Sequence, residues 1–145
     1  MRQNLAIYFQ KKRKFFEALF PQIEAACEGL IYVSETDARV RAFDGSGAGT
    51  VDGQNILQHL GGEPEELVIE LEFESFFDRL TLVKDWHSLQ EKERTKKFLE
   101  LKTLLEENLH DLKVFKIGQI RVRIFAVGID EDGCLTGITT EAVET

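Results

Sequence analysis

The fold of this chain is decided by residues 114–138, VFKIGQIRVRIFAVGIDEDGCLTGI. Within this stretch, residues 120–124 alternate apolar and charged side chains, which indicates a strand with one solvated face. Residues 125–129 form an unbroken apolar run, typical of a central strand that is covered on both faces. An Asp-Gly pair at 132–133 predicts a tight hairpin, so residues 134–138 are expected to return beside that strand.

Helices before and between the strands are expected to cover this sheet. Residues 5–27 place apolar side chains at three- and four-residue steps, and Pro21 predicts either two helices or one whose second part starts at the proline. A capping box at residues 88–91 opens the longest predicted helix, which runs to about Leu109. Two shorter helical segments are expected, at residues 52–60 behind an Asp52 N-cap and at residues 75–80.

Three further strands are expected upstream, at residues 30–33, 39–43 and 67–73. The glycine-rich segment 44–49 has neither the Gly-Lys-Ser/Thr ending of a Walker loop nor the glycine spacing of a dinucleotide fingerprint. We interpret it as a hairpin connection. Together these elements predict an α+β domain with helices packed on a mainly antiparallel sheet.

Length and composition agree with a single domain over residues 1–145. The 43% hydrophobic and 30% charged residues are those of an ordinary globular protein, and no stretch approaches the ~20 apolar residues of a membrane-spanning helix. Residues 1–20 lack the apolar core of a signal peptide. With only Cys27 and Cys134, no disulfide framework is expected, so we predict a reducing, cytoplasmic location.

The charge is −8, from 26 acidic and 18 basic residues, and it argues against direct nucleic-acid binding. No Lys or Arg occurs between Arg41 and Arg79 or after Arg123, so an acidic face that steers a basic partner and a merely solvated acidic surface both remain open. The basic, apolar segment at residues 1–22 favours contact with the core or with a second copy over a membrane surface, which leaves a homodimer open.

Motifs of catalysis and of metal or cofactor binding are absent from the sequence. His59, His87 and His110 stand far apart without a zinc-ligand partner, and the acidic turn at 130–133 lacks the ligand spacing of a calcium loop. Neither cysteine has a catalytic signature, and no nucleophile elbow occurs. No cofactor is predicted, and a small hydrolase built on an unrecognised carboxylate pair is the weaker hypothesis.

From about Ile23 to Thr145 the chain resembles the nuclease A inhibitor family. Four stretches carry the resemblance in order: Glu28-Gly29-Leu30 running into Val33-Ser34-Glu35, Phe73-Glu74-Ser75-Phe76-Phe77-Asp78-Arg79, Asp85-Trp86, and the ending Gly137-Ile138-Thr139-Thr140-Glu141-Ala142-Val143-Glu144-Thr145. Residues 36–39 lack the aromatic-proline run that comes after the Ser-Glu pair in that family. Residues 1–22 form an extra N-terminal helical segment outside the resemblance.

The resemblance implies a three-layer α/β/α sandwich that is not an enzyme. It implies a stoichiometric inhibitor that blocks the active-site cleft of a metal-dependent, sugar-non-specific DNA/RNA endonuclease. By the same resemblance Thr145 contacts the catalytic metal ion of the nuclease, Glu35 engages its arginines, and Asp85 and Trp86 make further contacts. Glu144 joins this partner-binding set as part of the Glu-Thr ending.

The chemistry of these residues agrees with that implication. Threonine and carboxylate oxygens are hard ligands suited to Mg²⁺, and a carboxylate such as Glu35 makes bidentate contacts with arginine. Simpler interpretations stay open at this point: Trp86 as partly buried core, Glu35 as the start of a turn, and Thr145 as a frayed end. A protein-binding adaptor of the same fold, without nuclease inhibition, is the alternative function.

Overall fold

The computed structural model describes residues 14–45, 50–60, 62–63 and 66–144. The helices in this part of the chain are α2 (Lys14–Cys27), α3 (Gly53–His59), α4 (Phe73–Leu80) and α5 (Leu89–Asn108). The strands are β1 (Ile31–Tyr32), β2 (Ala38–Arg39), β3 (Arg41–Asp44), β4 (Val68–Glu72), β5 (His110–Ile117), β6 (Arg121–Ile129) and β7 (Leu135–Val143).

Five strands form one antiparallel sheet in the order β3-β7-β6-β5-β4, and β1 pairs with β2 separately. The central strand is β6, where Phe125 lies opposite Phe115 of β5 and Thr139 of β7. Residues 124–128 of β6 are all buried, as the apolar run predicts. The predicted α+β fold on an antiparallel sheet is confirmed.

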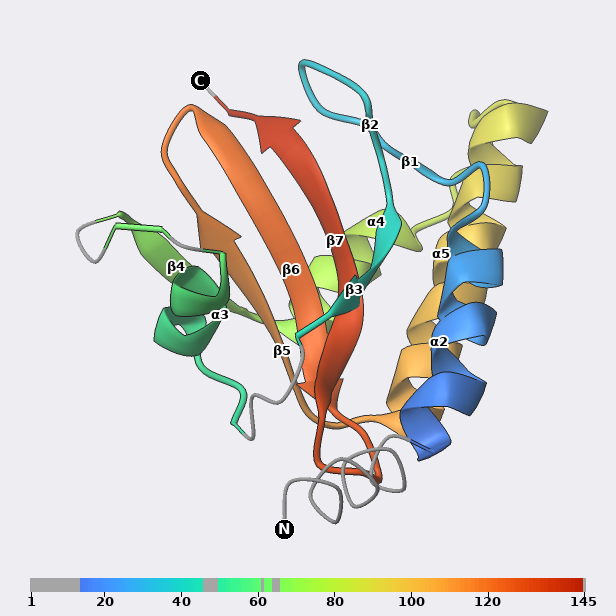
Figure 1. Ribbon diagram of the computed structural model, residues 1–145. Coiled ribbons are helices and arrows are strands. Elements are labelled where there is room, and N and C mark those ends of the chain that lie inside the picture. The colour runs from blue at the N-terminus through green and yellow to red at the C-terminus, as the bar shows by residue number, and fades with distance from the viewer. Residues whose placement is uncertain (1–13, 46–49, 61, 64–65, 145) are drawn as a thin grey trace, which may run out of the picture.

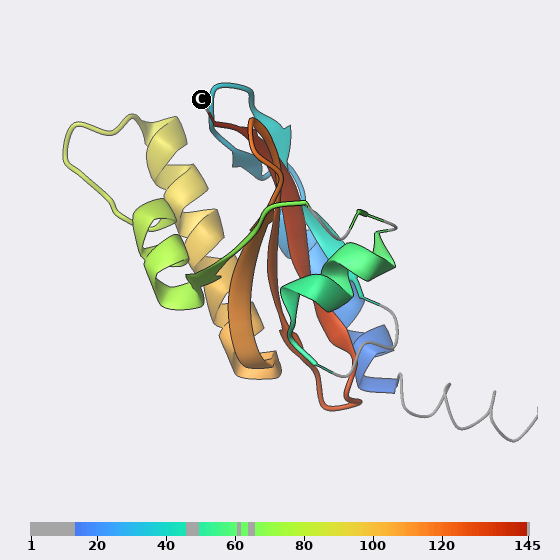
Figure 2. The ribbon, with the colours of Figure 1, turned by 90° about the vertical axis from the view of Figure 1, so that its left-hand side faces the viewer.

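The sheet separates two apolar cores, one on each face. Because side chains alternate along β6, Ile124 and Ala126 enter one core while Phe125 and Val127 enter the other. Helices α2, α4 and α5 cover the first core, and α3 covers the second, so the sheet lies between two helical layers (Figures 1 and 2). The three-layer α/β/α arrangement results directly from this alternation.

Local sequence signals set the ends of several elements as predicted. The Asp52 carboxylate accepts a hydrogen bond from the backbone N–H of Gln54, at 2.9 Å, and begins α3. Ser88 and Glu91 form the full capping box at the start of α5, with bonds of 3.1 and 3.2 Å. Gly133 has a φ of +79° in the β6–β7 hairpin, a conformation that glycine adopts without strain.

Three local predictions are wrong. A single helix, α2, runs through Pro21, so the proline neither divides the helix nor starts a second one. The strand expected at 39–43 is interrupted at Val40, whose N–H donates to Leu30 rather than to the large sheet. The segment 44–49 is not a hairpin connection, because the next element after β3 is the helix α3; residues 46–49 themselves lie outside the described part.

The β6–β7 hairpin also holds the start of α2. The Asp132 carboxylate accepts hydrogen bonds from the backbone N–H groups of Phe15 and Phe16, at 2.7 and 3.1 Å. Residues 1–13 of the basic, apolar segment 1–22 lie outside the described residues. Among the helices that are described, none has the length and apolarity to cross a membrane.

Candidate partner-binding site

Four segments of the chain lie toward one end of the molecule, which we call the tip. They are the β1–β2 loop (33–37), the α4–α5 loop (81–88), the β5–β6 turn (118–120) and the end of β7 (143–144). In Figures 1 and 2 this is the end that carries the C label. The sequence-predicted partner-binding residues within the described part of the chain all lie here.

The end of β7 is held from several sides. The backbone N–H of Val143 donates to the Ser34 hydroxyl of the β1–β2 loop, at 3.2 Å. The N–H of Glu144 donates to the carbonyl of Ile120 in the β5–β6 turn, at 2.9 Å. Its carboxylate pairs with the Lys116 ammonium of β5, at 2.5 Å. The approach to Thr145 is therefore anchored, while Thr145 itself lies outside the described residues.

Glu35 projects from the β1–β2 loop beside that anchor. Its side chain is exposed, and the neighbouring Ser34 fixes the loop by donating its hydroxyl to the Thr36 carbonyl at 2.7 Å while accepting from Val143. One serine thus ties the loop that carries Glu35 to the strand that leads to Thr145. This bond brings the β1–β2 loop, which carries Glu35, next to the end of β7, which carries Glu144.

Asp85 and Trp86 lie in the α4–α5 loop, beyond the β1–β2 loop. Trp86 is 77% exposed, which excludes its interpretation as partly buried core. The Lys84 ammonium stands 4.9 Å from the centre of the indole ring, a cation–π contact. The loop is further closed by a bond from the His87 N–H to the Lys84 carbonyl, at 3.0 Å. The indole is thus presented to solvent on a hydrogen-bonded turn.

Further apolar side chains around Trp86 were not identified from the sequence as site candidates. Leu82, Val83 and Leu89 are each more than half exposed, and so is Val33 across the tip. Large apolar side chains gathered on a surface mark interaction sites more often than scattered ones do. Their signal in the sequence was weak, because a short apolar run beside a helix start is equally typical of a core segment.

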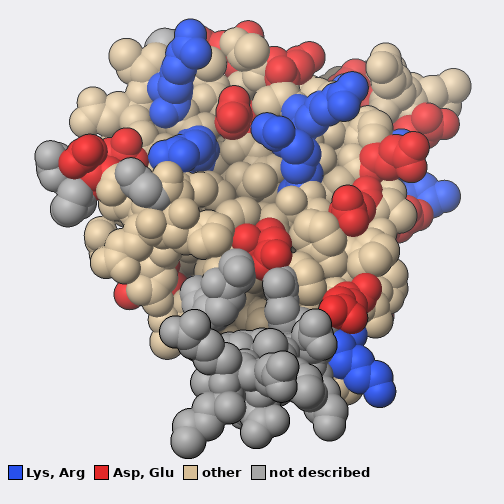
Figure 3. All heavy atoms as spheres, viewed as in Figure 1, with Lys and Arg blue, Asp and Glu red and all other residues tan. Residues whose placement is uncertain are grey.

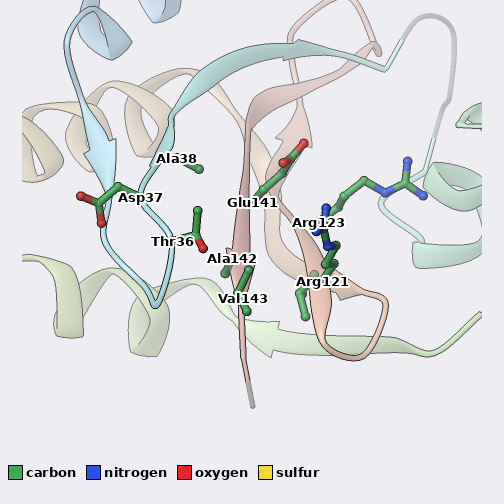
Figure 4. Close-up of a pocket in the computed structure, with 9 residues that line it drawn as sticks. Thr36, Asp37, Ala38, Arg121, Arg123, Glu141, Ala142 and Val143 are labelled. Atoms are coloured by element: carbon green, nitrogen blue, oxygen red, sulfur yellow. The ribbon is translucent and has the colours of Figure 1, made fainter.

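The tip is hollowed on both faces of the sheet. On the α4 side, Tyr32, Phe76, Lys116 and Glu144 line a hollow of about 490 Å³. The opposite face has one of about 390 Å³, with Arg121 and Arg123 on one side and Asp37 on the other, as Figure 4 shows. Both hollows border the β1–β2 loop and the end of β7.

Charges of both signs share the face that carries α3. Arg41 lies 3.9 Å from Glu141, and Arg123 lies 3.6 Å from Glu66. Figure 3 shows basic and acidic side chains interspersed over this face. Despite the net charge of −8, the acidic side chains do not form one continuous patch on the face seen in this view.

The described residues offer little catalytic chemistry. No group of three His, Cys, Asp or Glu side chains gathers among them to hold a metal ion. Burial, helped by Glu24, raises the pKa of the Cys27 thiol to about 12, so this thiol stays protonated at neutral pH.

One carboxylate pair, on α4 and α5, does show divergent acidities. A hydrogen bond from Lys102 lowers the pKa of Glu74, while desolvation raises that of Glu106. The side chain of Glu74 is 59% exposed, and the Lys102 ammonium lies 2.9 Å from it. A surface ion-pair network of this kind explains the shifts without a reaction site.

Comparison with known proteins adds one match. A family model described as nuclease A inhibitor-like protein matches residues 17–145. No curated protein matches the chain.

Proposed function

Because this chain belongs to the nuclease A inhibitor-like protein family, we propose that it is a stoichiometric inhibitor of a metal-dependent, sugar-non-specific DNA/RNA nuclease. The observation that carries this proposal is the family match, which extends over residues 17–145. The family is one of inhibitors rather than enzymes, and its partner is a nuclease. The protein acts by occupying the active-site cleft of that nuclease with its tip.

The chemistry of a nuclease cleft explains how the tip inhibits. Such a cleft binds phosphates and therefore presents Arg, Lys and a divalent metal ion. Glu35 offers a carboxylate to the arginines, in the charge-assisted, bidentate geometry that guanidinium groups favour. Thr145 brings oxygen ligands to the metal ion, which prefers hard oxygen donors. The inhibitor thereby takes the place of the scissile phosphate.

Residues of the α4–α5 loop supply the remaining contacts. Trp86 is the apolar anchor, because a large, exposed aromatic ring gains most from being desolvated in a protein interface. Asp85, beside it and also exposed, adds a second acidic contact. Glu144 takes part through its place at the end of β7, where its carboxylate is paired with Lys116.

The decisive experiment is a titration of this protein into a Mg²⁺-activated ββα-metal nuclease that digests plasmid DNA. We expect complete inhibition at equimolar protein. Glu35→Ala should inhibit less than the wild type, and the difference should be larger at low salt than at high salt, because salt screens exposed charge pairs. Glu107→Ala removes an exposed carboxylate from the far end of α5 and serves as the charge-matched control.

A protein-binding adaptor of the same fold is the alternative. It is favoured by residues 36–39, which lack the aromatic-proline run of the family next to Glu35. Digestion that continues at a micromolar excess of this protein would reject the inhibitor proposal and leave the adaptor.

A further inference from the structure

We infer that Lys116 is a positioning residue for inhibition: through its ion pair with Glu144 it fixes the direction in which the chain leaves β7 toward Thr145. The inference rests on the proposed function for its activity readout. Lys116 is proposed to act through Glu144 and not by touching the partner. The starting observation is that its side chain is unusually buried for a lysine.

Lys116 lies on an interior strand of the sheet, one residue before the end of β5. It belongs to β5, with Ile69 of β4 opposite on one side and Ile124 of β6 opposite on the other. Only 17% of its side chain is exposed, although lysine is among the residues least often buried. A lysine held this far from solvent needs a partner for its charge.

That partner is Glu144, which lies 28 positions further along the chain. Since β5 and β7 are separated by β6, the lysine side chain reaches across a whole strand to the carboxylate. Lys116 and Glu144 together line the hollow beside Tyr32 and a second hollow, of about 530 Å³, beside Ile120. The ion pair therefore borders two hollows at the tip and does not belong to either packed core.

Backbone hydrogen bonds hold the end of β7 up to Glu144, the last residue that the structure describes. The N–H of Val143 donates to the Ser34 hydroxyl, and the N–H of Glu144 donates to the Ile120 carbonyl. The side-chain pair adds a constraint on the last described residue. Ordering one flexible group before binding is worth about 0.5–1.5 kcal/mol, which corresponds to roughly two- to tenfold in affinity.

The test compares inhibition constants of variants that remove the pair. Lys116→Met keeps the apolar stem and loses the charge, and Glu144→Gln keeps the shape of the partner. We expect each to weaken inhibition about two- to tenfold, and the charge-swapped pair Lys116→Glu with Glu144→Lys to restore part of the loss. Lys113→Met, on the same strand and paired with Glu70 at 3.8 Å, is the matched control and should inhibit like the wild type.

Deleting Thr145 tells whether Lys116 acts by positioning the terminal residue or only by stabilising the structure. If Lys116 acts through the terminal residue, Lys116→Met produces no further loss in the protein that lacks Thr145, because the two changes then share one effect. If Lys116→Met weakens inhibition equally in the presence and in the absence of Thr145, the inference is overturned. Unchanged inhibition by Lys116→Met, with Thr145 deletion still harmful, would overturn it while leaving the proposed function intact.

A readout without a nuclease keeps the inference independent. The ¹H–¹⁵N heteronuclear NOE of the Glu144 and Thr145 amides should fall in Lys116→Met and stay at the wild-type value in Lys113→Met. An unchanged NOE would overturn the inference even if inhibition were lost. A wild-type protein that fails to inhibit would refute the proposed function, and the NOE would still decide whether Lys116 orders this end of the chain.

Discussion

Trp86 contributes little to the free energy of folding, because 77% of its surface stays in solvent. Because we propose Trp86 as the apolar anchor of the interface, we predict that Trp86→Ala weakens inhibition by at least about 2 kcal/mol, roughly thirtyfold, the size of a hot-spot residue. The free energy of unfolding should change by less than about 1 kcal/mol, including the lost contact with Lys84.

Two measurements check this prediction. Inhibition titrations compare Trp86→Ala with Leu99→Ala, which truncates a half-exposed apolar residue on α5 and should inhibit normally. Since Trp86 is the only tryptophan, its fluorescence in the wild-type protein reports directly on burial during binding. Wild-type potency in Trp86→Ala would remove the anchor role.

At the scale of elements, two helix starts make separate contributions to stability. The first is α5, where Glu91 accepts from the Ser88 backbone and accordingly has a lowered pKa. The ionised form is favoured by the fold, so its contribution is complete above the usual value near 4.5 and is lost as pH falls through the lowered pKa. We predict that Glu91→Gln loses less stability between pH 6 and about pH 3 than the wild type does.

Urea unfolding across that pH range is the measurement. Ser88→Ala, which removes the hydroxyl partner of the box, should also flatten the pH dependence. Identical pH profiles for the wild type and Glu91→Gln would mean that the capping carboxylate gains nothing from the folded state.

The second helix start is that of α2, and its cap comes from the far end of the chain. Asp132 accepts from two backbone N–H groups of α2 across more than a hundred residues of sequence. We predict that Asp132→Ala lowers the free energy of unfolding by about 1 kcal/mol, the usual cost of losing an N-cap. Asp132→Asn keeps an acceptor oxygen and the preference for a hairpin before Gly133, so it should retain most of the stability.

Equilibrium unfolding of the two variants decides between a cap and a turn effect. Loss in the alanine variant alone supports the cap. A midpoint of Asp132→Ala equal to that of the wild type would show that the Asp132 side chain does not stabilise α2.

At the scale of the whole molecule, the sequence predicted what adjacent residues determine. The apolar run of β6, the capping box at Ser88 and the Asp-Gly turn each act within a few residues, and each is found as predicted. The segment 44–49 was wrongly interpreted as a hairpin connection, although the helix behind Asp52 was predicted and is found as α3. That β3 pairs with β7, near the other end of the chain, has no local signature.

In the candidate site, too, the features set by adjacent residues were predictable and those set by distant residues were not. Asp85 and Trp86 are neighbours in sequence and share one loop. By contrast, Ser34 meets Val143 across 109 positions and Lys116 meets Glu144 across 28, so neither anchor was visible in the sequence. The large separation along the chain means that the sequence does not show how firmly the end of β7 is held.

Deletion of Thr145 should weaken inhibition by at least about 2 kcal/mol, the threshold of a hot spot, while leaving the thermal unfolding midpoint unchanged. Stability is expected to persist because the deletion keeps the bonds of Val143 and Glu144 to Ser34, Ile120 and Lys116. Thr145→Ser retains the hydroxyl and should inhibit well, whereas Thr145→Val keeps the shape without that oxygen and should inhibit less, since Mg²⁺ takes oxygen ligands. Full potency in the deletion variant would place the inhibitory contact elsewhere on the tip, in Glu35 and the α4–α5 loop.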